Sequence, residues 1–132
     1  MIRFISILIM ITMIFITMQA IAADENIRTC TLTNAFACTS DDGCKEVSIK
    51  ELLAPRFIRI DLKTKTISSL DRNIARDNTK IAAIEHLKGM LVMQGTEQRG
   101  WSITIGDDSG ELTLSASGDG ESVVVFGSCL NP

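Results

Sequence analysis

Residues 100–129 read GWSITIGDDSGELTLSASGDGESVVVFGSC, and this stretch decides the fold class. It contains three runs of alternating or β-branched apolar residues, separated by two turns rich in Gly and Asp. The runs are residues 100–106, 111–117 and 121–129, and the turns are 107–110 and 118–120. Alternation with a period of two is typical of half-buried strands, and Asp-Gly turns are typical of hairpins. The stretch therefore predicts three consecutive antiparallel strands.

The same pattern continues toward the N-terminus, where short runs are again separated by turn residues. The further predicted strands are 29–38, 44–47, 56–62, 66–70, 80–86 and 90–97. In the first of them, Cys30, Leu32 and Phe36 are expected on one face. Strands joined by tight turns must be antiparallel, and a long meander either closes or leaves edges exposed. We therefore expect an all-β, up-and-down meander of eight or nine strands in a closed or nearly closed barrel, with a two-sheet sandwich as the alternative.

One short helix is expected between the second and third strands. Ser48 and Glu51 have the spacing of a capping box, in which each side chain bonds the backbone N–H of the other residue. Residues 52–54 could complete one or two turns, and Pro55 would end them.

The N-terminus has the three parts of a secretory signal peptide. Arg3 is a minimal positive region, residues 4–18 are almost entirely apolar, and Ala20-Ile21-Ala22 provides small residues at a cleavage site. We expect residues 1–22 to be removed, leaving residues 23–132 as a single exported domain in the periplasm or outside the cell. The alternative is an uncleaved membrane anchor, because residues 4–23 are uncharged and just long enough to span a bilayer.

The charge of the expected mature domain limits its partners. Removal of the first 22 residues, of which only Arg3 is charged, would leave 12 basic and 16 acidic residues and a net charge of −4. An acidic balance argues against nucleic acid or an anionic membrane as the main partner. The chain has no Tyr and one Trp, which makes a base-stacking platform improbable. Another exported protein is a possible partner.

Four cysteines form an even set in a small exported domain, which favours two disulfides. Cys38 and Cys44 flank a five-residue turn, so a hairpin brings them together. Cys30 lies in the first strand and Cys129 in the last, and these strands are neighbours in a closed meander. We predict the pairs Cys38–Cys44 and Cys30–Cys129. A zinc site is the alternative, but paired Cys-x-x-Cys spacing is absent.

Candidates for chemistry are few, and no cofactor or metal is expected. His86 is the only histidine, and we interpret it as a solvated residue at a strand end. Trp101 is expected in the core, with ligand stacking inside a barrel as the alternative. Carboxylates gather at three turns, where they suit either calcium or turn geometry, and we favour turn geometry. These carboxylates are Asp41, Asp42, Asp107, Asp108, Glu111, Asp119 and Glu121.

Short motifs in the chain resemble those of two groups of exported proteins. Cys30, Gly100-Trp101-Ser102 and Phe126-Gly127-Ser128-Cys129 resemble an arrangement in small uncharacterised exported bacterial β-proteins, which implies no activity. Ser115-Ala116-Ser117-Gly118 is similar to a stretch in the periplasmic or membrane-bound inhibitors of c-type lysozyme, which are small β-barrels. That family continues with a Tyr, which this chain lacks, so the resemblance assigns no inhibitory residue.

These observations favour a noncatalytic exported binding or accessory protein of unknown ligand. Three alternatives remain open from the sequence. They are an inhibitor of a secreted hydrolase such as lysozyme, a structural or assembly component of the envelope, and a small hydrolase that uses His86 with turn carboxylates.

Overall fold

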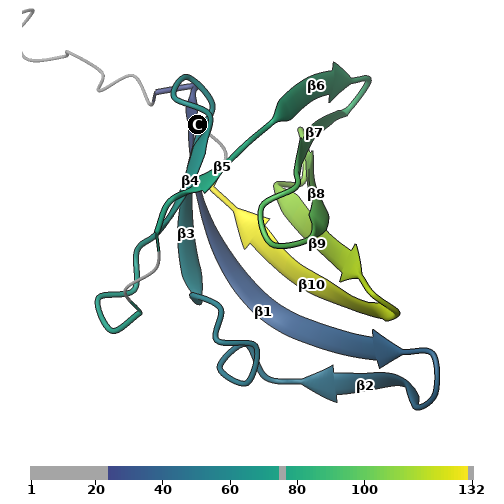
Figure 1. Cartoon of the computed structure of the whole chain (residues 1–132). Coiled ribbons are helices and arrows are strands. Elements are labelled where there is room, and N and C mark those ends of the chain that lie inside the picture. Colours follow the sequence, from purple (N-terminus) through teal and green to yellow (C-terminus); the bar gives the residue numbers. More distant parts are fainter. Residues whose placement is uncertain (1–23, 75–76, 131–132) are drawn as a thin grey trace, which may run out of the picture.

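The structure is a computed structural model that describes residues 24–74 and 77–130. The predicted signal peptide, residues 1–22, lies outside the described residues. The described chain is all-β, with ten strands in one antiparallel sheet (Figure 1). The strands are β1 (Ile27–Thr39), β2 (Gly43–Val47), β3 (Phe57–Asp61), β4 (Thr66–Ser69), β5 (Thr79–Lys80), β6 (Ala83–Leu87), β7 (Met90–Gly95), β8 (Gly100–Gly106), β9 (Glu111–Gly118) and β10 (Glu121–Cys129).

The long strand β1 organises the sheet. Its N-terminal half pairs with β3 and its C-terminal half pairs with β2, so these two strands share one edge of β1. The other edge pairs with β10 along nearly its whole length. From β10 the sheet continues as a simple meander through β9, β8 and β7 to β6, while β4 and β5 extend it beyond β3. Antiparallel hairpins are thus confirmed at β1–β2, from β3 to β5 and from β6 to β10. The expected uninterrupted meander is wrong, because β2 and β3 both pair with β1 and not with each other.

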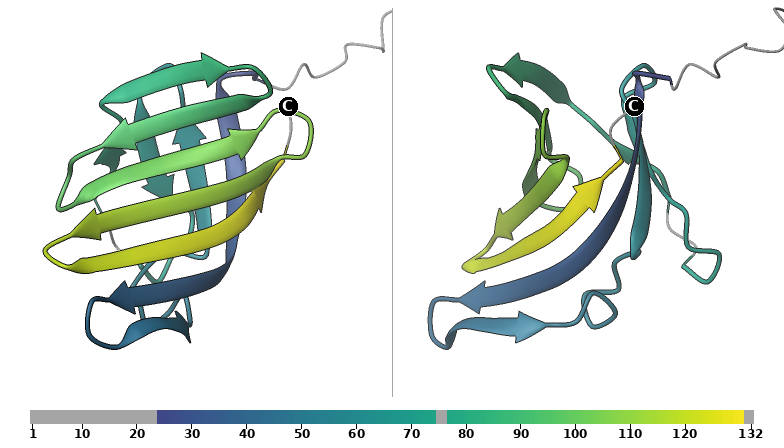
Figure 2. Two further views of the ribbon diagram at one scale, coloured as in Figure 1. Left: turned by 90° about the vertical axis from the view of Figure 1, so that its right-hand side faces the viewer. Right: turned by 180° about the vertical axis from the view of Figure 1, so that it is seen from behind.

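The sheet curls strongly into a half-barrel rather than closing. Figure 2 shows strands β6 to β10 as one wall, with β3 and β4 crossing behind it as the opposite wall. The expected strand 80–86 is split: β5 pairs with β4, and β6 pairs with β7 at the other end of the sheet. Between them, the Ile81 N–H donates to the Lys65 carbonyl at 2.9 Å, and the Ala82 N–H donates to the Gln94 carbonyl at 2.8 Å. We expected a closed or nearly closed barrel. The sheet is strongly curled but not fully closed, so the closed form is wrong, and the single sheet also differs from a sandwich.

A β-bulge in β1 changes which residues face the interior. The register steps from Leu32 opposite Gly127 to Asn34 opposite Phe126, so Thr33 is an extra residue on β1. Its hydroxyl donates to the Phe126 carbonyl at 3.2 Å. An extra residue inverts the alternation that follows it. Phe36, which was expected to share the face of Leu32, is therefore turned outward, while Ala35 is buried.

The expected short helix is absent from the described residues, although its capping box forms. The Ser48 N–H donates to Glu51 Oε2 at 2.6 Å, and the Glu51 N–H donates to Ser48 Oγ at 3.2 Å. Only one turn follows, because Leu53 adopts a left-handed φ of 52° and Pro55 comes two residues later. The segment is a capped turn between β2 and β3.

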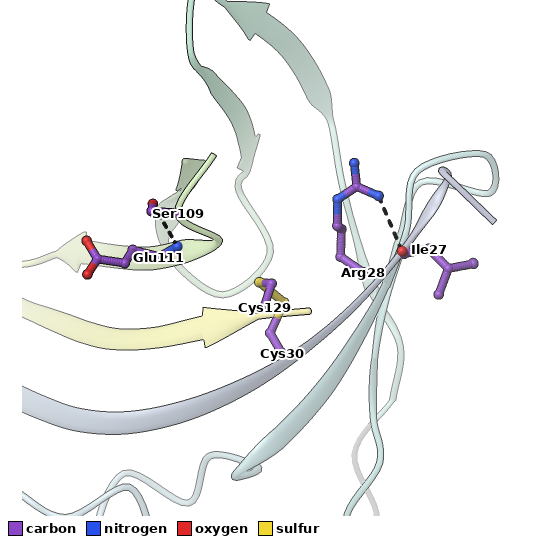
Figure 3. The surroundings of a disulfide bond; sticks show 6 residues. All are labelled: Ile27, Arg28, Cys30, Ser109, Glu111 and Cys129. Atoms are coloured by element: carbon purple, nitrogen blue, oxygen red, sulfur yellow. Dashed lines mark hydrogen bonds between the residues drawn. A yellow bond between two sulfur atoms is a disulfide. The ribbon is translucent and has the colours of Figure 1, made fainter. Parts of the chain in front are cut away.

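The two disulfides join the pairs predicted from the sequence. Cys30 and Cys129 lie directly opposite each other on β1 and β10 and bond across a separation of 99 residues (Figure 3). Cys38 and Cys44 bond within the β1–β2 hairpin, across 6 residues. Two disulfides in so small a domain are typical of an oxidising compartment.

The core is concentrated at the end of the half-barrel that holds the Cys30–Cys129 bond. Its residues are apolar and come from most of the strands. They are Cys30, Leu32, Ala35, Ile58, Ile60, Ile81, Leu91, Met93, Ile103, Ile105, Leu112, Val125 and Cys129. No helix in the described part of the chain is long and apolar enough to cross a membrane.

Candidate functional site

The interior of the half-barrel is packed at one end and hollow at the other. On β9, the inward residue Leu112 is fully buried near the Cys30–Cys129 bond, whereas Leu114 and Ala116 further along are only partly buried. On β8, Ile105 is buried and Trp101 is partly buried. In the register of β8 against β9, Trp101 lies opposite Ala116 and Ile105 lies opposite Leu112, so the partly buried residues of both strands lie at the same end. The apolar side chains at that end therefore line a space instead of filling it.

This space is a cavity of about 780 Å³. Its floor is apolar and is formed by inward residues of the two walls, among them Leu32, Ile58, Trp101, Leu114 and Val125. The capped turn between β2 and β3 contributes apolar residues at one side of the mouth. Cavities that bind small molecules have volumes of roughly 300–1,000 Å³, are mainly apolar and carry a few polar groups. The hollow end matches this description in size. Its lining is mixed, because polar residues such as Ser68, Ser69 and Thr79 lie beside the apolar ones.

The position of Trp101 depends on the glycine opposite it. Gly95 on β7 pairs with Trp101 on β8, and both face the interior. A Cβ atom at residue 95 would overlap the indole ring and would lie 2.8 Å from its Nε1 atom. The indole can therefore lie over this backbone only because residue 95 has no side chain. Trp101 both packs against the core cluster, as expected, and lines the cavity.

The indole N–H of Trp101 has an unmet hydrogen bond. Its Nε1 atom is buried and has no acceptor among the described residues. A buried donor without an acceptor costs about 1–3 kcal/mol. Trp101 has the largest side chain in the cavity wall, so this unmet hydrogen bond makes the packing around the indole a less stable part of the interior.

The mouth of the cavity carries charged side chains. Arg99, on the loop before β8, forms an ion pair with Glu121 at the start of β10, with 3.1 Å between Nη2 and Oε2. Glu97, on the same loop, accepts the backbone N–H of Lys80 at 3.1 Å. Asp77, two residues before β5, also lines the cavity. The mouth thus combines a polar rim with an apolar floor.

The structure does not bring the chemically reactive candidates together. His86 lies on β6, is exposed, and is not among the residues that line the cavity. The turn carboxylates are spread over three separate hairpins, and of these only Glu121 reaches the cavity. Within the described ranges, no group of three or more His, Cys, Asp or Glu side chains could hold a metal ion.

Shifted carboxyl groups have local structural causes. The Ser48 N–H and hydroxyl hold the pKa of Glu51 below its ordinary value. Hydrogen bonds from Thr64, chiefly its backbone N–H, lower the pKa of Asp61, and those from Asn26 lower the pKa of Asp24. Hydrogen bonds to a carboxylate favour its ionised form. None of the three groups lines the cavity, so these shifts reflect turn geometry rather than a reactive site.

The outward face carries an aromatic pair that the alternation in the sequence did not predict. The rings of Phe36 on β1 and Phe126 on β10 meet edge to face, with centroids 6.3 Å apart. Both side chains are more than a third exposed. The pair follows from the bulge at Thr33, which turns Phe36 outward.

Sequence reasoning missed the cavity and the role of Gly95. A glycine at the end of an alternating strand and opposite a tryptophan is a signal that could have been used.

Comparisons of the chain with protein-family models, with curated proteins and with solved structures found no match.

Proposed function

We propose that residues 23–132 form a noncatalytic binding protein, exported to the periplasm or secreted, that holds a small apolar or amphipathic molecule in the hollow end of the half-barrel. The observation that carries the proposal is the cavity of about 780 Å³ with its apolar floor and polar rim. A wide β-barrel of about eight strands can hold one small ligand in its interior. Burial of the ligand's apolar surface would supply most of the binding free energy.

Export is supported by two independent features. Residues 1–22 have the composition of a signal peptide, and the two disulfides suit an oxidising compartment. The intact mass of protein isolated from the periplasm or medium tests this part of the proposal. We expect a chain that begins at Ala23, and a membrane-bound chain that retains Met1 would contradict it.

Ligand binding can be followed without a label on the protein. Trp101 is the only tryptophan, the chain has no tyrosine, and the indole lines the cavity. Its fluorescence therefore reports on the site itself. Titration with Nile red, a neutral dye that brightens in apolar surroundings, should raise the dye emission and quench Trp101 by energy transfer.

A matched pair of variants locates the dye. Ala116→Phe fills the cavity from β9, whereas Thr113→Phe places the same ring on the outward face of that strand. We expect Ala116→Phe to weaken Nile red binding by at least about tenfold, which corresponds to about 1.4 kcal/mol. Thr113→Phe should leave it unchanged. Equal binding by both variants would show that the dye lies elsewhere and would contradict the proposal.

A further inference from the structure

We propose that the occupant of the cavity is a cationic amphiphile, an apolar chain that ends in an ammonium group. The inference rests on the proposed function and adds the charge of the ligand's head group. The inference comes from the balance of charge at the mouth of the cavity. If the apolar chain of a ligand occupies the hollow end, its head group lies at this mouth.

Acidic side chains outnumber basic ones among the residues that line the cavity. Three are carboxylates, those of Asp77, Glu97 and Glu121, and one is a cation, Arg99. The Arg99 guanidinium is already engaged by Glu121 at 3.1 Å. The ion pair leaves the mouth with two further carboxylates and no further cation among its lining residues. An anionic head group would therefore face repulsion, and a cationic one would be attracted.

One of these carboxylates is held in place. Glu97 Oε2 accepts the Lys80 backbone N–H at 3.1 Å, which fixes the side chain across the loop without neutralising its charge. A carboxylate has about four lone-pair sites, so this bond leaves acceptor capacity for an ammonium group. The net charge of −4 expected for the mature domain has the same sign and would draw a cation toward the mouth.

The experiment compares three ligands that share one chain and differ in head group: decylamine, decanol and decanoate. Each is titrated below its micelle concentration into the wild-type domain at low ionic strength and neutral pH, with Trp101 emission as the readout. Because charge pairs at an exposed mouth are individually weak, we expect decylamine to bind about three- to tenfold more tightly than decanol. Decanoate should bind more weakly than decanol. Salt at about 1 M, where the screening length is about 3 Å, should remove most of this preference.

Two double variants separate the effect of the carboxylates at the mouth from the effect of the net charge of the domain. Asp77→Asn with Glu97→Gln removes the two uncompensated carboxylates, and the glutamine can still accept the Lys80 N–H. Glu85→Gln with Glu111→Gln changes the net charge by the same amount at exposed residues that do not line the cavity. We expect the preference for decylamine to disappear in the first variant and to persist in the second.

The outcomes distinguish the two proposals. Equal binding of the three ligands, tighter binding of decanoate, or an unchanged preference in the mouth variant would overturn the inference and leave the proposed cavity function standing. If none of the three ligands or Nile red binds, the proposed function fails, and the inference fails with it.

Discussion

Removal of the Cys30–Cys129 disulfide should destabilise the domain much more than removal of Cys38–Cys44. The first bond spans 99 residues and the second spans 6. If a disulfide acts mainly by restricting the unfolded chain, a loop of about 100 residues is worth about 4.7 kcal/mol and a loop of about seven is worth about 2.4 kcal/mol. The double variants Cys30→Ala/Cys129→Ala and Cys38→Ala/Cys44→Ala should therefore differ by about 2.3 kcal/mol in their free energy of unfolding.

Burial increases the expected difference. Cys30 is 1% exposed and Cys129 is 9% exposed, whereas Cys44 is exposed on the hairpin. Replacing the buried pair with alanine leaves space in the packed end of the core, and such a void costs about 1 kcal/mol. The same replacement at the hairpin leaves no such void at Cys44.

Thermal and urea unfolding followed by circular dichroism measure both variants. For a domain of this size, about 1 kcal/mol corresponds to about 4–8 °C, so the buried-pair variant should melt at least about 10 °C below the hairpin variant. Mass spectrometry without reduction confirms in each variant that the remaining bond is intact. Equal losses, or a larger loss for the hairpin pair, would refute the reasoning from loop length and burial.

Three further predictions concern the backbone and the capped turn. Gly127→Ala should cost more than about 2 kcal/mol in urea unfolding, because its Cβ would overlap a β1 carbonyl at the bulge, whereas Gly118→Ala, with room for a Cβ, should cost far less. Leu53→Gly should raise the free energy of unfolding by up to about 1 kcal/mol by relieving the left-handed φ of 52°, and no gain would contradict that strain. Glu51 has a lowered pKa in the folded state, so its stabilising contribution is present above its ordinary pKa and is lost as pH falls through the folded value. Ser48→Ala removes the hydroxyl but keeps the backbone N–H, so an NMR titration should find Glu51 ionised at lower pH in the wild type than in this variant. Identical curves would contradict the contribution of the hydroxyl.

Most of the strand pattern was predictable because alternation and turn residues agree along the chain. In the β9–β10 hairpin, Asp119 and Gly120 both adopt positive φ, as a two-residue turn of this kind requires. The disulfide pairs were also predictable, since one needs only a hairpin and the other needs only β1 beside β10. That adjacency holds in the half-barrel and does not depend on full closure.

The remaining features depend on contacts between distant segments. The bulge at Thr33 is defined by the register of β1 against β10, and nothing local distinguishes Phe36 before that pairing is known. The split of residues 79–87 arises because its two halves pair with strands at opposite ends of the sheet. The capping box forms, but the left-handed backbone at Leu53 prevents the expected helix from continuing after it. The cavity is lined by residues of β1, β3, β4, β8, β9 and β10, so its form depends on how segments far apart in the sequence pack together.

The central claim is that the hollow end of the half-barrel is the binding site, and a heteronuclear NMR titration of the wild-type domain with decylamine tests it most directly. The single indole N–H of Trp101 gives one resolved signal, and it has no acceptor among the residues that the structure describes. We predict that saturable shifts will include this signal and the amides of cavity residues such as Leu114 and Val123. Shifts confined to the outward face around Phe36 and Phe126, with the Trp101 signal unchanged, would contradict the account.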